Sequence, residues 1–155
     1  MHFEDSSLIS YHSGPYDSDE WSCPLLAIGW LEDPQPYNKG KTSSEFRRKL
    51  QALVDASQPM YPQYYFRGMY NCSFCDKQEY SGIWSQQNIF VPGDGVVYLS
   101  PGGISHYVSD HSYKPPQSFI DAVLQCPDYG SAAYCDVLKE VNHVIDPPLK
   151  PKSNW

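Results

Sequence analysis

The chain has 155 residues, and its 11 Lys and Arg against 18 Asp and Glu give a formal net charge of −7. This length suits one domain. The acidic excess is spread evenly, which argues against a nucleic-acid binder, because such a protein needs a cationic surface. No apolar run approaches the roughly 20 residues that span a bilayer, so we expect no membrane association. The first residues also lack the pattern of a secretory signal, so we expect no secretion by that route.

The first third of the chain predicts one strand and one helix. Residues 1–24 are polar and read as irregular, partly extended chain. Residues 25–31 form an apolar run typical of a buried strand, in which Gly29 indicates a bulge or a close backbone approach. Thr42 and Glu45 have the spacing of a capping box at the start of a helix. Four apolar residues then recur at helical spacing: Phe46, Leu50, Leu53 and Val54.

The middle of the chain predicts three more strands and a second helix. Residues 64–70 read as a strand, and the runs 87–92 and 95–100 flank Gly93-Asp94-Gly95, which indicates a hairpin. Ser100-Pro101 has the order of an N-cap followed by Pro at the first helical position, so we expect a helix to begin there.

Two further helices are expected before a loose C-terminus. Pro115-Pro116 opens one, and Ser131 caps the other. Their predicted inward residues are Phe119, Ile120, Val123 and Leu124 in the first and Tyr134, Val137, Leu138 and Val141 in the second. The chain is therefore predicted to be a single α+β domain over residues 1–145, with a loose Pro/Lys tail over 146–155. Its small, mostly antiparallel sheet would pack against about four helices.

Two cysteines and two histidines carry the strongest chemical signal. Cys72 and Cys75 form a Cys-x2-Cys turn, and His106 and His111 follow with four residues between them. Two thiolates and two imidazoles suit tetrahedral Zn²⁺, and four protein ligands make such a site structural. A predicted hairpin and helix start lie between the two pairs, so the order resembles the ββα element of Cys2His2 zinc fingers.

Two features of the spacing depart from that pattern. The pairs are separated by 30 residues, whereas 12 to 15 is usual. Five residues on an ideal helix turn about 500°, so His106 and His111 would point about 140° apart. They can share an ion only if the last turn opens, and Pro115 makes such an irregular end plausible.

Other interpretations of these residues stay open. Cys72 and Cys75 can be buried thiols or a redox pair, and His111 can be a core histidine. Cys126 is the main substitute for one of the four ligands. Cys23 and Cys135 are expected to be core thiols. The odd count of five cysteines favours reduced thiols and a cytoplasmic setting.

Several motifs resemble an uncharacterised family of small bacterial proteins. They are Gly29-Trp30-Leu31, Phe66-Arg67-Gly68 with Cys72-x2-Cys75, Asn88-x-Phe90-Val91-Pro92-Gly93, and His106-Tyr107-Val108-x2-His111-x-Tyr113-x-Pro115-Pro116-x2-Phe119. The resemblance covers roughly residues 25–125. It implies a bacterial source and a shared metal-like constellation, and it implies no activity.

Three functional hypotheses follow. The first is a non-enzymatic, zinc-stabilised interaction module that binds a basic protein partner, for example as an immunity or antitoxin-type protein, since charge complementarity speeds association. The second is a small enzyme that uses Cys72 or Cys75 with His106, although no catalytic signature surrounds them. The third is a zinc-finger-like nucleic-acid binder, which the negative charge disfavours.

Overall fold

A computed structural model of the chain describes residues 2–9, 22–57, 71–75 and 88–141. Its elements in chain order are β1 (Leu25–Ala27), α1 (Ser44–Ser57), β2 (Asn88–Pro92), β3 (Val97–Pro101), α2 (Ile104–Asp110), α3 (Gln117–Gln125) and α4 (Ala132–Val141). The predicted α+β class is confirmed. The predicted strand at 64–70 and the Pro/Lys tail at 146–155 lie outside the described residues.

The three strands form a mixed sheet in the order β1-β3-β2. β2 pairs with β3 antiparallel, as the hairpin signal predicted, and Gly93 donates its N–H to the carbonyl of Val96 (2.8 Å) in the turn. β1 pairs with β3 in parallel, with Leu26 opposite Tyr98. The sheet is therefore mixed and not mostly antiparallel as predicted. The long connection between β1 and β3 allows the parallel crossover.

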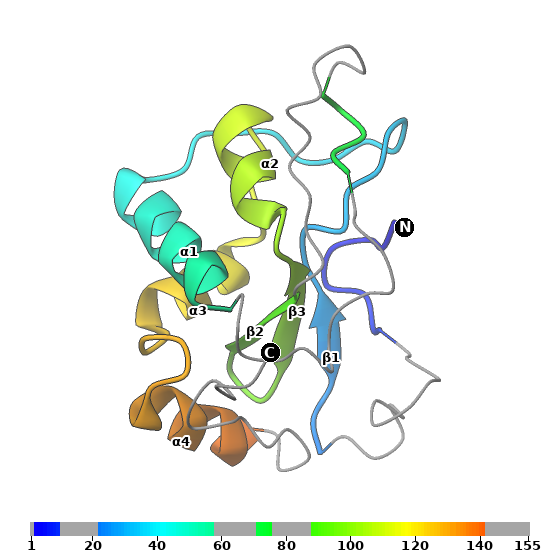
Figure 1. Cartoon of the computed structure of the whole chain (residues 1–155). Helices are drawn as coiled ribbons and strands as arrows, with labels where there is room; N and C mark the ends of the chain where they lie inside the picture. Colours follow the sequence, from blue (N-terminus) through cyan, green and yellow to red (C-terminus); the bar gives the residue numbers. More distant parts are fainter. Residues whose placement is uncertain (1, 10–21, 58–70, 76–87, 142–155) are drawn as a thin grey trace, which may run out of the picture.

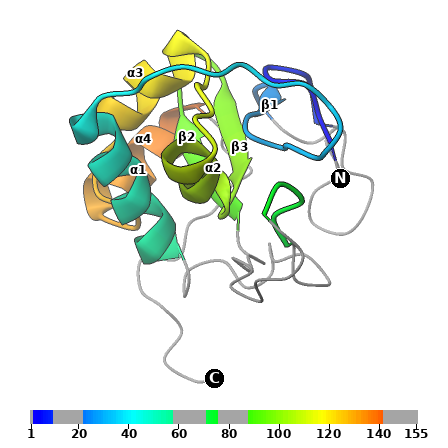
Figure 2. The same ribbon diagram turned by 90° about the horizontal axis from the view of Figure 1, so that it is seen from above.

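Helices α1, α3 and α4 lie on the β2 side of the sheet, and the N-terminal segment lies on the β1 side (Figures 1 and 2). Helices α1, α3 and α4 all contact β2. On the other edge, the N-terminal segment runs antiparallel to β1: Ile9 donates to the Leu25 carbonyl (3.0 Å), and Ala27 donates to the Ser7 carbonyl (2.9 Å). The open edge of β1 is therefore covered by the chain's own backbone, which limits pairing with other molecules.

Ser100 and Pro101 belong to β3, so the helix predicted to begin there is displaced. Pro101 lies opposite Asn88 in the β2–β3 ladder. β1 ends its pairing at Leu99, so the missing N–H of Pro101 breaks no ladder bond on that side. A turn follows, and α2 begins at Ile104 with Gly103 as its N-cap. The hairpin followed by a helix confirms the predicted ββα order.

Two serines cap the helices that flank the sheet. Ser43, rather than the predicted Thr42, caps α1 by accepting the Phe46 N–H (3.1 Å). Thr42 instead accepts a hydrogen bond from the Arg47 guanidinium. Ser131 caps α4 as predicted, accepting the Tyr134 N–H (3.1 Å).

Most of the predicted inward residues are buried in the core, but Leu124 of α3 is exposed, and Val137 and Val141 of α4 are only partly buried. The four apolar residues of α1 are buried, as are Phe119, Ile120 and Val123 of α3. Leu124 of α3 is 39% exposed instead, because the buried arc of this short helix centres on Phe119 and Val123 and extends to Ala122. Two buried aromatics satisfy their polar atoms on strand carbonyls. Trp30 Nε1 donates to Leu99 (2.9 Å), and the Tyr134 hydroxyl donates to Phe90 (2.7 Å).

Gly29 marks the close approach that its place in the sequence indicated. Its φ is +76°, and a Cβ placed there would lie 2.7 Å from Cδ1 of Ile104, the first residue of α2. Its N–H donates to the Asp5 carboxylate (3.1 Å), which also accepts the hydroxyl of the buried Tyr113 (2.8 Å). Gly29 thus lets the chain after β1 pack directly against α2.

We expect Gly29→Ala to destabilise the fold more than Gly95→Ala. Both positions have positive φ, which costs about 1–2 kcal/mol for alanine. Gly95 has open space where its Cβ would go, whereas Gly29 has the Ile104 side chain there, which adds about 1–3 kcal/mol of overpacking. Urea unfolding of both variants measures this difference, and equal losses of stability would contradict the close approach.

Candidate metal centre

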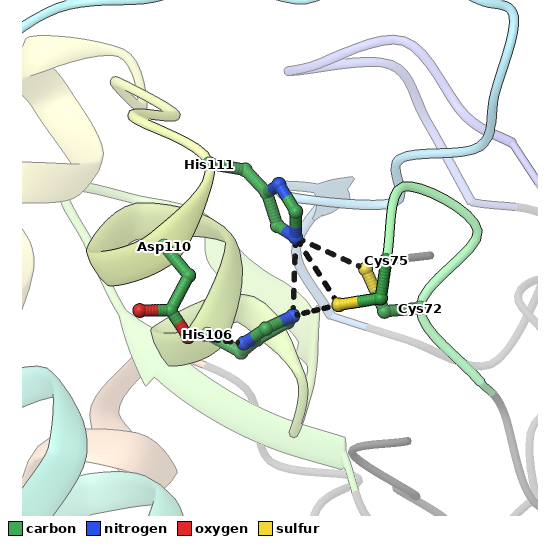
Figure 3. A network of polar contacts seen from close by, with 5 residues as sticks. All are labelled: Cys72, Cys75, His106, Asp110 and His111. Atoms are coloured by element: carbon green, nitrogen blue, oxygen red, sulfur yellow. Dashed lines mark hydrogen bonds and ion pairs between the residues drawn. The ribbon is translucent and has the colours of Figure 1, made fainter. Parts of the chain in front are cut away.

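Two segments that are far apart in the sequence bring four ligand-type side chains together. Cys72 and Cys75 come from the loop 71–75, and His106 and His111 come from α2 and the residue after it (Figure 3). One donor atom from each side chain lies within 4.8 Å of all the others. This is the only group of three or more Cys, His, Asp or Glu of this kind among the described residues.

The individual distances are short and nearly equal. Cys72 Sγ lies 3.3 Å from His111 Nε2, and Cys75 Sγ lies 3.3 Å from His106 Nε2. Cys75 Sγ is also 3.6 Å from His111 Nε2, and the two Nε2 atoms are 3.2 Å apart. Cys72 and His106 are buried, while Cys75 and His111 are partly exposed. The cluster therefore lies at the edge of the core, where an ion can reach it from solvent.

The helix end opens at His111, which lets the two histidines converge. His111 is the C-cap of α2, with φ −119° and ψ 13°, and Ser112 follows with φ +54°. His111 has left the helical path, so the 140° separation of an ideal helix no longer applies. The sequence predicted this opening from Pro115, and the structure places the irregularity three to four residues earlier.

A segment between β1 and α1 holds the opened end in place. The Tyr37 hydroxyl donates to the His111 carbonyl (2.9 Å). Gly40 donates its N–H to the Ser112 carbonyl, and Lys114 donates to the Asn38 carbonyl, both at 2.9 Å. These bonds fix the backbone at His111 and just after it, so chain well outside α2 helps to set the position of its ring.

The loop that carries the cysteines is anchored beside them. Phe74 packs against Tyr37 (ring centroids 5.2 Å), Tyr107 (6.1 Å) and His111 (5.6 Å). Ser73 Oγ accepts the N–H of Asp33 at 2.9 Å. An apolar aromatic wall therefore covers one side of the cluster and lowers the dielectric around it.

Two pKa shifts reflect these surroundings. Burial lowers the pKa of His111, and the neighbouring His106 lowers it further. The neutral imidazole is the form that offers a lone pair to a metal. Burial also raises the pKa of Tyr107 to about 12, with the Cys72 and Cys75 sulfurs as the next causes. Tyr107 is therefore a neutral phenol beside the cluster.

The other cysteines do not join the group. Cys126 follows α3, and burial raises the pKa of its thiol to about 12. It is outside the set of donor atoms within 4.8 Å, so it does not replace a ligand in this arrangement. Cys135 is 2% exposed, and Cys23 is partly buried against the core. Arg67, from the motif before the cysteines, lies outside the described residues.

Sequence reasoning missed two neighbours of the cluster. His106 Nδ1 lies 2.7 Å from Asp110 Oδ2, one helical turn further along α2. The spacing of four residues on a predicted helix is the signal that could have found it. Tyr37 was also missed, because 74 residues separate it from the carbonyl it contacts and no local pattern encodes that contact.

The comparisons with known proteins bear on family and not on activity. No helix in the described ranges combines the length and apolarity needed to cross a membrane. The comparison with curated proteins gave no match, and the comparison with solved structures gave none. Residues 1–124 match a family described as a domain of unknown function (DUF7919), and all four residues of the cluster fall inside this range. The chain therefore belongs to this uncharacterised family.

Proposed function

We propose that Cys72, Cys75, His106 and His111 bind one structural Zn²⁺, and that the chain is a zinc-stabilised, non-enzymatic interaction module. The ion would tie the loop 71–75 to the end of α2. Two thiolates and two neutral imidazoles form a donor set that favours zinc over hard cations such as Mg²⁺ or Ca²⁺. Four protein donors complete a tetrahedron and leave no position for a substrate, which supports a structural role.

The edge lengths of the cluster carry this proposal. With Zn–S at about 2.3 Å and Zn–N at about 2.05 Å, a regular tetrahedron has N···N edges of about 3.3 Å and S···N edges of about 3.6 Å. The N···N distance is 3.2 Å, and three S···N distances are 3.3, 3.3 and 3.6 Å. These four of the six edges are close to the lengths of a zinc tetrahedron, and all four donors lie within 4.8 Å of one another.

We expect the purified chain to hold one zinc ion and to lose about 10 °C of melting temperature when a chelator removes it. Free zinc at about a thousand times its Kd contributes about 4 kcal/mol, and 1 kcal/mol shifts the melting temperature of a domain this size by about 2–4 °C. Metal analysis and calorimetry measure both quantities.

A matched pair of variants tests the ligands directly. Cys72→Ala removes a proposed ligand and should abolish stoichiometric binding, whereas Cys135→Ala removes a buried thiol of α4 and should keep one zinc per chain. Equal zinc content in the two variants, or no zinc in the wild type, would overturn the proposal.

A second candidate function has one observation in its favour. Cys75 Sγ lies 3.3 Å from His106 Nε2, and His106 Nδ1 lies 2.7 Å from Asp110 Oδ2, an order that resembles the thiol, base and carboxylate of a hydrolase. Such a site would contain no metal, and one thiol would react rapidly with an alkylating reagent. In the metal site, both thiols should resist the alkylating reagent until a chelator removes the ion. The rate of alkylation without a chelator therefore distinguishes the two functions.

The proposed partner is a basic protein in the cytoplasm. The net charge of −7 favours a cationic partner, and five cysteines without a disulfide are typical of a reducing compartment. An immunity or antitoxin-type role is one concrete form of this proposal. A basic toxin gene beside this gene in related genomes would support that form.

An open depression of about 680 Å³ supplies a place for such a partner. Residues of the β2–β3 turn, α3 and α4 line it. In Figure 1 the β2–β3 turn and α4 lie at the end of the sheet away from the loop 71–75. Buried Tyr98, Ala122 and Cys126 contribute to its lining, and the exposed carboxylates of Asp94 and Asp121 also line it. Its described lining contains no Lys, Arg or His, so its charge complements a Lys- or Arg-rich segment.

We expect Asp94→Asn/Asp121→Asn to weaken binding of an acetylated oligolysine peptide about fivefold at low ionic strength, since each rim charge contributes about 0.5 kcal/mol. The matched control is Glu45→Gln/Asp55→Asn on α1, which changes the net charge equally. Asp55 accepts a hydrogen bond from Gln51, as Asp121 does from Gln117. Fluorescence anisotropy gives the two dissociation constants. Equal weakening by both variants would show that net charge alone determines binding.

A further inference from the structure

We propose that Asp110 is a positioning residue of the metal site, which holds His106 in the tautomer that directs its Nε2 lone pair at the ion. The proposal rests on the proposed zinc site and adds a residue that is not a ligand. It also predicts which nitrogen of His106 binds the metal.

The geometry assigns the two nitrogens of His106 to different tasks. Nδ1 lies 2.7 Å from Asp110 Oδ2, and Nε2 lies 3.3 Å from Cys75 Sγ. In Figure 3, Asp110 and the sulfur atoms lie on opposite sides of the His106 ring. An ionised carboxylate only accepts hydrogen bonds, so Nδ1 must carry the proton and Nε2 must be the atom with the free lone pair.

The rest of the cluster explains why His106 needs this partner. His111 is positioned through its backbone, because its carbonyl accepts the Tyr37 hydroxyl and its N–H donates to the Tyr107 carbonyl (3.1 Å). His106 is inside α2, where the helix fixes the backbone but leaves the rotation of the ring and the choice of tautomer open. The contact with Asp110 fixes both, at the last residue of the same helix.

The charge of Asp110 contributes little directly. Its side chain is 61% exposed, whereas that of His106 is 6% exposed. Solvent screens an exposed charge, so its direct attraction to an ion beyond the imidazole is weak. A carboxylate is also unfavourable near a helix C-terminus, so α2 gains no stability from the macrodipole by having Asp110 there. The effect of Asp110 on the metal must therefore pass through His106.

The test is zinc affinity of the full chain, measured by competition with a chromophoric chelator. Asp110→Ala should lower the affinity 10- to 100-fold, which is the usual effect of losing a carboxylate behind a ligating histidine. Asp136→Ala removes an exposed carboxylate from α4 and should leave the affinity within twofold of the wild type. The melting temperature of the zinc-free Asp110→Ala chain should stay close to that of the zinc-free wild type, because a contact to a largely exposed carboxylate contributes little to the stability of the fold.

Two further readouts separate positioning from charge. In a His106→Ala background, adding Asp110→Ala should change the affinity less than twofold, since the residue through which Asp110 acts is gone. Nitrogen-15 spectra of the zinc-loaded wild type should show His106 protonated at Nδ1 and metal-bound at Nε2, and Asp110→Ala should broaden the Nδ1 proton by exchange with water.

The outcomes distinguish this inference from the function on which it rests. A wild type that binds no zinc would overturn both. A wild type that binds zinc with an Asp110→Ala variant of equal affinity would overturn the positioning role alone. Two other findings would also overturn the positioning role. One is that His106 binds the ion through Nδ1. The other is that Asp110→Ala lowers the affinity as much in the His106→Ala background as in the wild type.

Discussion

The convergence of four electron-pair donors at the junction between the loop 71–75 and the end of α2 is the constraint around which this part of the molecule is organised. Their donor atoms lie within 4.8 Å of one another, although the whole segment 76–103 lies between the loop and α2 in the sequence. Two imidazole nitrogens with lone pairs and two sulfurs at this separation repel one another when the thiols are ionised. A divalent cation at the centre turns that repulsion into attraction.

The surrounding fold prepares this junction from several directions. The hairpin β2–β3 ends in the turn that starts α2, and the Gly29 contact sets α2 close to the chain after β1. The segment 37–40 holds the opened helix end at His111, and Phe74 packs the cysteine loop against the same aromatic side chains. Apart from the turn between β3 and α2, these contacts join segments distant in sequence. The donor cluster therefore depends on the whole α+β core and not on a local zinc-finger unit.

Local patterns predicted much of the fold. The stripe of α1 and the Gly93-Asp94-Gly95 hairpin were confirmed because apolar periodicity and turn residues act over a few neighbours. The start of α2 was wrong by several residues, because the β2–β3 ladder extends to Pro101, and pairing with a distant strand overrode the local Ser-Pro signal. The parallel pairing of β1 with β3 was also not predicted, because it depends on tertiary structure and not on a local sequence pattern.

In the candidate site, too, features set by local spacing were predictable, whereas contacts between distant segments were not. The four ligand-type residues were predictable from their chemistry and spacing, and the structure brings all four together. Asp110 was within reach of a spacing argument, since it lies four residues after His106 on one helix. The contacts of Tyr37 and Asp33 with the site were not, because they depend on how the long connection after β1 folds back over α2.

Zinc K-edge X-ray absorption of the metal-loaded chain measures the proposed coordination directly. We expect two sulfur neighbours at about 2.3 Å and two nitrogen neighbours at about 2.0–2.1 Å, with the outer-shell scattering of two imidazole rings. A first shell of nitrogen and oxygen alone, or one with a water in place of a protein ligand, would contradict it.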